Sequence, residues 1–359
     1  MVVLQNGYGK VKPMGLLVKE TEFFGLDIGS TAIRLVQLRR GGVHPALVAY
    51  GALPVPTNLT ASDSKIDQDK ISELVKQLVR ENRVTLKNVV VGLPANKVFA
   101  TVITTPKIDN SQLAKAIRYQ AEQYIPMALD QVKLDWAVID QSKDGKQLEV
   151  LLVAAPVSVV EKYMYITEKA GLEALALEAN AIAVARSLVP TNNLAVALVD
   201  FGALESDISI VWNNAPRLVR SVSVGGLTLV RGVAQSLGLD EVQATQFTYK
   251  FGLTQSKLEG QVFKAIKPTL DNLVSEVEKS AKYFTGRYPD VKLEKLVVTG
   301  STSALPELGP FLANSTGLPV EFGNAWVNVS YPSGLQDKLM SLSSEYAAAV
   351  GLAGRGLIG

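Results

Sequence analysis

Hydrophobic positions along the chain group into short continuous runs and into stretches with helical spacing. Two segments, 23–38 and 194–212, share one pattern: an apolar run that ends in Asp-x-Gly, a short turn, and a second β-rich run. Superposing them aligns three pairs of residues: Asp27 with Asp200, Gly29 with Gly202, and Ser30 with Ala203. A strand–turn–strand unit repeated about half a chain apart predicts two halves of similar architecture.

The segments around these two units alternate in type. Helical periodicity and apolar runs predict helices over 71–83, 112–125 and 271–288 and strands over 88–93, 132–140, 148–155 and 296–299. The turn at Asp144-Gly145 favours a hairpin, and Ser158 with Glu161 has the spacing of a capping box at the start of a helix. We therefore expect 97–171 to form a compact strand–helix–strand–strand–helix block inserted into the first half of an α/β or α+β protein.

Composition excludes several kinds of chemistry. The 359 residues include no Cys and one His, His44, which argues against disulfides, zinc sites, cysteine nucleophiles and almost any histidine triad. Any metal should therefore be a hard ion with oxygen ligands, which favours Mg²⁺. The net charge of +2 gives no reason to expect nucleic acid or an anionic membrane as the main partner. The longest apolar run, 148–160, is shorter than the ~20 residues of a membrane span, so a cytoplasmic protein is expected.

The first candidate site is the turn after Asp27. Glycine at position 29 lets backbone N–H groups approach a phosphate, and Ser30 and Thr31 add hydroxyl donors. Asp27 is suited to hold the hydration shell of Mg²⁺. Taken alone, such a turn is more often an ordinary strand end. The interpretation gains weight because the turn occurs twice, and two such turns that face each other across a cleft would hold a polyphosphate.

The second turn and two later glycine segments extend this candidate site. The second turn carries Asp200, Gly202, Ala203 and Ser206. A buried strand over 296–299 ends in a run of small residues that would offer a flat surface to a purine and a ribose: Gly300, Ser301 and Ser303. The pair Gly225-Gly226 lies between a strand and the next helix. Each of these last two segments, taken alone, is equally compatible with an ordinary strand-to-helix turn.

The order of these segments resembles a known group of proteins. Seven stretches carry this resemblance: GLDIGSTAIRLVQL (25–38), QAEQYIPMALDQVKLDWAVID (120–140), VLLVAAPVSVVEKYMYITEKAGL (150–172), LVDFGALESDISIV (198–211), the glycines 225–226, LVVTGSTSALPELGPFL (296–312) and EYAAAVGLAGRG (345–356). From about residue 22 onward, the sequence resembles the actin-like ATPase superfamily, which includes actin, Hsp70 and sugar kinases. Within it, Tyr124-Ile125-Pro126 followed by Leu134-Asp135-Trp136 resembles the PilM family of type IV pilus assembly proteins, relatives of FtsA.

The resemblance implies an actin-like, ribonuclease H-like fold of two lobes with a small inserted subdomain of the SHS2 type. The implied divisions are a flexible segment 1–21, a first lobe from 22–96, 172–193 and 341–359, the subdomain 97–171, and a second lobe 194–340. The first 20 residues lie before the first predicted strand, and we expect them to be flexible.

The resemblance also implies ATP and Mg²⁺ as ligands, bound between the lobes. The implied nucleotide residues are Asp27, Gly29, Ser30 and Thr31 in the first phosphate loop, Asp200, Gly202, Ala203 and Ser206 in the second, Gly225, Gly226 and Lys250, and Gly300, Ser301 and Ser303 beside the adenosine. Asp27 and Asp200 would hold the Mg²⁺ through water.

A peptide partner is implied as well. In PilM-like proteins a groove takes the cytoplasmic N-terminal peptide of PilN, an inner-membrane protein, and the pair links the pilus motor to the alignment complex. The candidate groove residues are Tyr124, Ile125, Pro126, Leu134 and Trp136, although most of them could instead fill the core of the subdomain. We expect attachment to the inner membrane through this partner, because the sequence does not end in the basic amphipathic helix expected of an FtsA-like protein. Self-association is a further possibility.

Three positions depart from the family pattern. Ser301 stands where a second glycine is usual, Ser206 where a threonine is usual, and Ala244-Thr245-Gln246 before Lys250 where Ala-Glu is usual. No residue stands out as a general base, so we expect ATP to bias lobe closure, with weak hydrolysis at most. Two alternatives are an FtsA-like filament-forming protein and, less favoured, a small-molecule kinase of the same superfamily.

Overall fold

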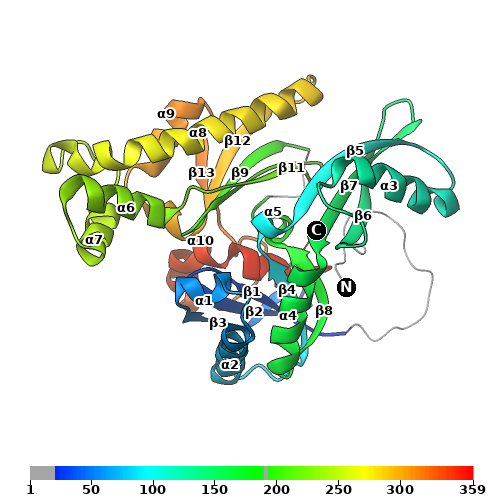
Figure 1. Ribbon diagram of the computed structural model, residues 1–359, viewed down its shortest axis with the longest axis horizontal. Helices are drawn as coiled ribbons and strands as arrows, with labels where there is room; N and C mark the ends of the chain where they lie inside the picture. Colours follow the sequence, from blue (N-terminus) through cyan, green and yellow to red (C-terminus); the bar gives the residue numbers. More distant parts are fainter. Residues whose placement is uncertain (1–20, 190–192, 359) are drawn as a thin grey trace.

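The computed structural model describes residues 21–189 and 193–358. Within them, strands form two five-stranded sheets and one three-stranded sheet, with helices between and outside them (Figure 1). The predicted flexible segment 1–21 lies outside the described residues except for its last position. None of the described helices combines the length and hydrophobicity that a membrane span requires.

The first sheet has the strand order β3-β2-β1-β4-β8. Its strands are β1 (Phe24–Ile28), β2 (Ala32–Arg39), β3 (Ala46–Pro54), β4 (Asn88–Leu93) and β8 (Glu173–Ala179). The first three strands form an antiparallel meander, and β4 and β8 run parallel to β1. β1 and β4 carry almost only apolar, fully buried residues, because helices cover both faces of the sheet.

The second sheet repeats this arrangement, with the order β11-β10-β9-β12-β13. Its strands are β9 (Ala195–Phe201), β10 (Ser206–Trp212), β11 (Ala215–Val222), β12 (Leu293–Thr299) and β13 (Val320–Phe322). Again the first three strands are antiparallel, and the last two run parallel to the first. The predicted repeat of a strand–turn–strand unit is thus confirmed, and it extends to the whole sheet.

Two helices lie between the two large sheets. They are α5 (Asn180–Leu188) and α10 (Gln336–Ala353), and one hydrophobic cluster joins them to Val36 of the first sheet and Leu198 of the second. The helices approach closely because Gly351 has no side chain: a Cβ there would lie 1.8 Å from the carbonyl oxygen of Ala183. These two helices, which we call the floor, pack against both large sheets and form the layer between them.

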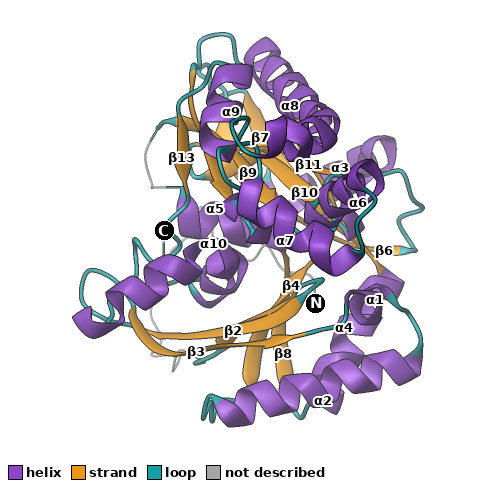
Figure 2. Cartoon of the chain, turned by 90° about the vertical axis from the view of Figure 1, so that its left-hand side faces the viewer, coloured by secondary structure: helices purple, strands orange, loops and turns teal. Residues whose placement is uncertain are grey.

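Other helices cover the outer faces of the large sheets. α2 (Lys65–Glu81) and α4 (Val157–Lys169) pack on the first sheet, and α6 (Gly226–Leu237), α8 (Gln261–Arg287) and α9 (Leu308–Thr316) pack on the second. Figure 2 shows the first sheet between α2 and α10. The remaining short helices are α1 (Thr57–Ala61), α7 (Glu241–Phe251), η1 (Ala95–Lys97), η2 (Leu258–Gly260), η3 (Ser301–Ala304) and η4 (Ser333–Leu335).

The small sheet has the order β5-β7-β6 and carries helix α3 (Asn110–Tyr124) on one face. Its strands are β5 (Phe99–Pro106), β6 (Val132–Gln141) and β7 (Gln147–Pro156). The predicted hairpin is confirmed, with Gly145 at a φ of 72° in its turn. The predicted capping box is wrong: α4 begins at Val157, directly after Pro156, without a side-chain cap.

Helix α4 belongs to a different core than the predicted block suggested. Val160, Tyr163 and Ile166 are buried in the same cluster as Phe24 and Leu26 of the first sheet. The range 97–171 therefore ends in a helix that packs on the first sheet rather than on α3. The bounds of the two predicted lobes and of the inserted subdomain stay predictions.

Candidate functional site

The two hairpins that carry the Asp-x-Gly motifs have the same turn. The Gly29 N–H donates to the carbonyl oxygen of Ala32, and the Gly202 N–H donates to that of Glu205, both at 3.0 Å. Across the strands, Asp27 pairs with Arg34 and Asp200 pairs with Asp207. The turns thus place chemically different residues at matching positions.

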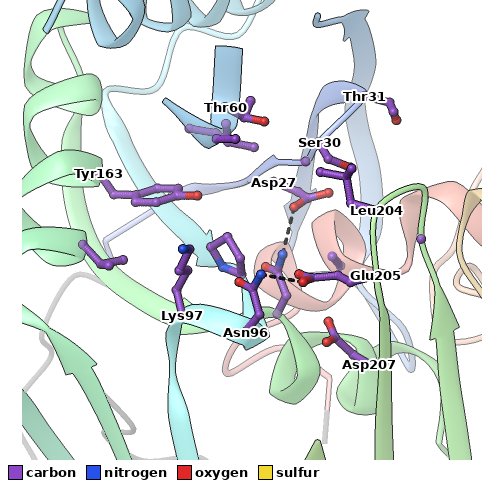
Figure 3. Close-up of a pocket in the computed structure, with 18 of the residues that line it drawn as sticks. Asp27, Ser30, Thr31, Thr60, Asn96, Lys97, Tyr163, Leu204, Glu205 and Asp207 are labelled. Atoms are coloured by element: carbon purple, nitrogen blue, oxygen red, sulfur yellow. Dashed lines mark hydrogen bonds between the residues drawn. The ribbon is translucent and has the colours of Figure 1, made fainter. Parts of the chain in front are cut away.

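Both turns line one cavity of about 790 Å³, between the large sheets and beside α4. Nine of the predicted nucleotide residues lie on its wall: Asp27, Gly29, Ser30, Thr31, Asp200, Gly202, Ala203, Gly300 and Ser301. Figure 3 shows Ser30, Leu204 and Glu205 from the two turns around this space, with Thr60 and Tyr163 on the side of α1 and α4. A cavity of this size lies within the range of ~300–1,000 Å³ that small-molecule sites occupy.

The other five predicted nucleotide residues are not on the cavity wall. Ser206 is fully buried and donates to the carbonyl oxygen of Val224 at 2.6 Å. Ser303 donates to the carbonyl oxygen of Gly300. Lys250 is exposed in the last turn of α7, with its Nζ 5.4 Å from the centre of the Phe251 ring.

The glycine pair supports the second turn from behind. A Cβ on Gly225 would lie 2.5 Å from the carbonyl oxygen of Ala203, and the Gly226 N–H donates to the carbonyl oxygen of Gly202 at 3.1 Å. Thr302 Oγ1 donates to the same Gly202 oxygen at 2.8 Å. The start of α6 and the η3 segment therefore fix the second turn in place.

Asp27 is buried beside a cation and an amide. Burial raises its pKa, while the Arg34 guanidinium and the hydrogen bond that Asn180 Nδ2 donates at 3.1 Å act in the opposite direction. Arg34 is itself buried and forms an ion pair with Glu345 of α10, which also lines the cavity. The first turn thus has a positive charge next to its carboxylate.

The second turn gathers carboxylates. Burial, together with the charges of Asp207 and Asp27, raises the pKa of Asp200 to about 7. Burial also raises the pKa of Asp207 to about 6 and, with the charge of Asp207, that of Glu205 to about 7. Figure 3 shows Asp27, Glu205 and Asp207 around the same space. Three carboxyl groups therefore crowd this side of the cavity, and each gives up its proton less readily than in water.

These residues fit a polyphosphate with a hydrated Mg²⁺ ion. Carboxylates with raised pKa values are stabilised in their charged form by a nearby cation. Asp27 and Asp200 offer oxygen acceptors to coordinated water, whereas Asn180 donates to Asp27 through Nδ2 and its side-chain oxygen is buried against Gly92. Across the described ranges no group of three or more acidic, His or Cys side chains is arranged to hold a metal ion. Binding of Mg²⁺ through water by Asp27 and Asp200 stays a prediction.

Sequence reasoning missed several residues of the cavity wall. Arg34 and Asp207 each follow their motif aspartate by seven residues, a spacing that places them opposite it across a tight hairpin, and this spacing could have found them. Asn180 and Asn96 carry no comparable pattern. Asn96 in η1 donates to Glu205 and so connects the approach to the small sheet with the second turn.

The predicted peptide-groove residues divide into two sets. Tyr124 and Pro126, at the end of α3, are exposed. Ile125 is buried, and Leu134 and Trp136 pack partly buried against the same core beneath α3. The neighbouring Met127 lines the cavity, so the exposed pair lies close to its rim.

The fold places the chain among actin-like proteins. The structure is similar to the ethanolamine utilization protein EutJ from Carboxydothermus hydrogenoformans, with a TM-score of 0.57 and 14% identity over 94% of this chain and 89% of that one. It is also similar to MreB5 of Spiroplasma citri bound to AMPPNP, with a TM-score of 0.53 and 11% identity over 93% of this chain and 95% of that one. At these identities the likeness shows a common two-lobed, actin-like fold.

A family model identifies the chain more specifically than the fold does. The type IV pilus assembly protein PilM family matches residues 25–357, and the chain belongs to this family. Its structure is similar to a chain of the solved PilM-PilN type IV pilus biogenesis complex, with a TM-score of 0.80 and 27% identity over 94% of this chain and 99% of that one. The predicted resemblance is thereby confirmed, and the filament-forming and kinase alternatives are not favoured.

Proposed function

We propose that the protein is a nucleotide-responsive adaptor of the type IV pilus assembly machinery, which binds the cytoplasmic N-terminal peptide of a PilN-like membrane protein. The observation that carries this proposal is the match to the PilM family over nearly the whole chain, together with the likeness to a chain of a PilM-PilN complex. Through this partner the protein would lie at the inner membrane. Contacts with the pilus motor and self-association belong to the same proposal.

The nucleotide part of the proposal rests on the cavity. The backbone N–H groups and hydroxyls of Ser30 and Thr31 would bind phosphate oxygens, while Gly29, whose own N–H donates to Ala32, leaves room for their approach. Asp27 and Asp200 would orient the water around Mg²⁺, and bound Mg²⁺ would supply the positive charge that the carboxylates of the second turn lack. Because the wall comes from both large sheets, a ligand that touches both turns favours their closed arrangement.

We infer binding with weak hydrolysis at most. Thr245 stands where the family pattern has a glutamate that commonly helps to hold the nucleotide. Steady phosphate release on the order of 1 per second would contradict this part of the proposal. A malachite green assay with MgATP at several protein concentrations measures it directly.

The peptide surface is proposed at the exposed end of α3. Tyr124 and Pro126 offer apolar area beside the cavity rim, whereas Ile125, Leu134 and Trp136 support that surface from the core. A disordered tail that becomes ordered on binding would gain both apolar contacts and backbone hydrogen bonds there.

The test is a titration of a labelled N-terminal peptide from the PilN-like protein of the same organism, followed by fluorescence anisotropy with MgATP present. We expect saturable binding with a Kd in the micromolar range or tighter, about −8 kcal/mol. Tyr124→Ala should weaken binding by about 10-fold, the loss expected for an aromatic contact. Tyr119→Ala is the matched control, since this tyrosine is also exposed on α3 but five residues away, on another face. Absence of binding at high peptide concentration would contradict the adaptor function.

A further inference from the structure

A buried arginine connects the second sheet to the small sheet. Arg217 of β11 has no exposed side-chain surface, and its guanidinium forms ion pairs with Asp140 of β6 at 2.9 Å and with Glu149 of β7. It also donates to the carbonyl oxygen of Trp212 at 3.2 Å and lies over the Trp212 ring, 5.0 Å from its centre. Arg217 is therefore held on its own sheet while its charge faces the small sheet.

A second set of contacts comes from the end of α8 and the loop after it. Arg287 pairs with Glu149 at 3.3 Å and donates to the carbonyl oxygen of Val102 at 2.9 Å. The Tyr288 hydroxyl donates to Glu149 at 2.7 Å. In Figure 1 the C-terminal end of α8 extends towards the small sheet.

The charges of these contacts, in contrast to the exposed pairs at the edge of the interface, are sorted by sheet. The second sheet and its helix α8 supply both arginines, and the small sheet supplies both carboxylates, Asp140 and Glu149. Asn213, in the turn between β10 and β11, adds an amide that donates to Asp140 at 3.1 Å. We name the four charged residues the clasp: Asp140, Glu149, Arg217 and Arg287.

The small sheet contacts the first sheet in a different way. Val102, Leu151 and Val153 are buried in the hydrophobic cluster of the first sheet, and the chain runs directly from β4 into β5 and from α4 into β8. Separating this apolar contact would expose hydrophobic surface to water. Separating the clasp would return four charges to water, which largely compensates for their lost contacts. Of the two contacts, the clasp is therefore the one that can open.

The position of the clasp relative to the cavity indicates the effect that its opening would have. The large sheets share the floor formed by α5 and α10, and the cavity lies above this floor. The apolar contact holds the small sheet to the first sheet. The interactions described above join it to the second sheet through β11, the turn at Asn213, the end of α8 and the Asn96–Glu205 contact. We propose that the clasp is a releasable lock that holds the two large sheets closed over the cavity. Its consequence for nucleotide exchange rests on the proposed function.

The experiment exploits the absence of cysteine in the chain. Spin labels on a Glu122→Cys, Glu278→Cys background report the distance between exposed positions on α3 and α8 by pulsed electron paramagnetic resonance. We expect one narrow distance distribution for this parent. Glu149→Gln, which keeps the shape but removes the carboxylate shared by both arginines, should add a population at longer distance. Asp140→Asn should do so more weakly, and it provides the test if Glu149→Gln does not fold.

Lys143→Gln is the matched control. Its ion pair with Asp290 crosses the same interface at 3.2 Å, but both side chains are over four-fifths exposed, so its loss should leave the distribution unchanged. A distribution in folded Glu149→Gln and Asp140→Asn identical to that of the parent would overturn the proposal, as would an equal change in Lys143→Gln.

A second readout separates this proposal from the proposed function. The dissociation rate of a fluorescent ATP analogue should rise at least about 5-fold in Glu149→Gln and stay unchanged in Lys143→Gln. If the rate is unchanged in both variants, the lock does not control exchange and the proposal is overturned in that respect. If the analogue does not bind to the parent, nucleotide binding itself is contradicted, and the distance measurement alone decides on the clasp.

Discussion

The two hairpins of the cavity share a backbone but differ in their chemistry and support. In the first, Asp27 lies opposite Arg34, and in the second, Asp200 lies opposite Asp207. The first turn carries Ser30 and Thr31 at its tip, whereas the second carries Ala203 and Leu204. The two turns therefore share one backbone geometry. The first presents hydroxyl donors at its tip, and the second gathers carboxylates.

The two turns also differ in what holds them. The second turn is clamped from behind by the start of α6 and by η3, through hydrogen bonds to Gly202 and close backbone contacts of Gly225 and Gly300. The first turn is held by the residue that follows β3, since the Val55 N–H donates to the carbonyl oxygen of Thr31 at 2.9 Å. The repulsive carboxylates thus sit on the more firmly supported turn, which resists their mutual repulsion.

The largest loss of stability is expected at Gly300, where the η3 segment approaches the backbone of the second turn most closely. Gly300 has a φ of 91°, and a Cβ there would lie 2.4 Å from the carbonyl oxygen of Phe201 and 2.5 Å from Asp200 Oδ1. Gly300→Ala should lower the free energy of unfolding by about 4 kcal/mol, because both the backbone conformation and the contact are unfavourable. Denaturant unfolding followed by circular dichroism measures the change.

Gly171→Ala separates the two causes. Gly171 has a similar φ of 78°, but a Cβ there would meet nothing within 4 Å. Its loss should be about 1 kcal/mol, from the backbone conformation alone. Equal losses at the two positions would show that the close approach to the second turn has no energetic weight.

A smaller effect is expected from the carboxylates themselves. The raised pKa values of Asp200, Asp207 and Glu205 mean that the folded state binds protons that the unfolded chain releases. Without nucleotide or Mg²⁺, stability should therefore fall as the pH rises from about 4 to about 7, and level off above. Asp207→Asn removes one charge and its repulsion on Asp200, so it should flatten this slope and add about 2 kcal/mol at pH 8. Urea unfolding at a series of pH values tests both statements.

Asp144→Asn is the control for this series. Hydrogen bonds from Ser142 and the Lys146 N–H lower the pKa of exposed Asp144, so its contribution to stability is constant above about pH 4 and is lost only as the pH falls further. Asp144→Asn should therefore leave the slope between pH 5 and 8 unchanged. A profile of Asp207→Asn that matches the parent between pH 5 and 8 would contradict the assigned repulsion.

The sequence was sufficient for the hairpins and insufficient for what surrounds them. The motif around Asp27 and Asp200 predicted both turns because an apolar run that ends in Asp-x-Gly and a small residue is a local feature. The hydrogen bond of Ser206 could not be predicted, because the direction of its hydroxyl, towards Val224, depends on how the chain continues after the strand that pairs with β10. The roles of Asn180 and Arg217 depend on contacts between segments far apart in the chain, which no local pattern records.

The smallest effect concerns the two serines that follow the turns' aspartates. Ser30 lines the cavity, whereas Ser206 is fully buried beneath the second turn. Ser30→Ala should weaken MgATP binding by about 5-fold, or about 1 kcal/mol for one lost hydrogen bond, and leave the unfolding free energy unchanged. Ser206→Ala should do the reverse, lowering stability by about 1 kcal/mol, because the Val224 carbonyl loses its donor, while affinity stays the same. Isothermal titration calorimetry and denaturant unfolding of both variants measure the two quantities. If Ser206→Ala weakens binding as much as Ser30→Ala does at equal stability, the second turn contacts phosphate through its hydroxyl as the first does, and the division between the two hairpins is wrong.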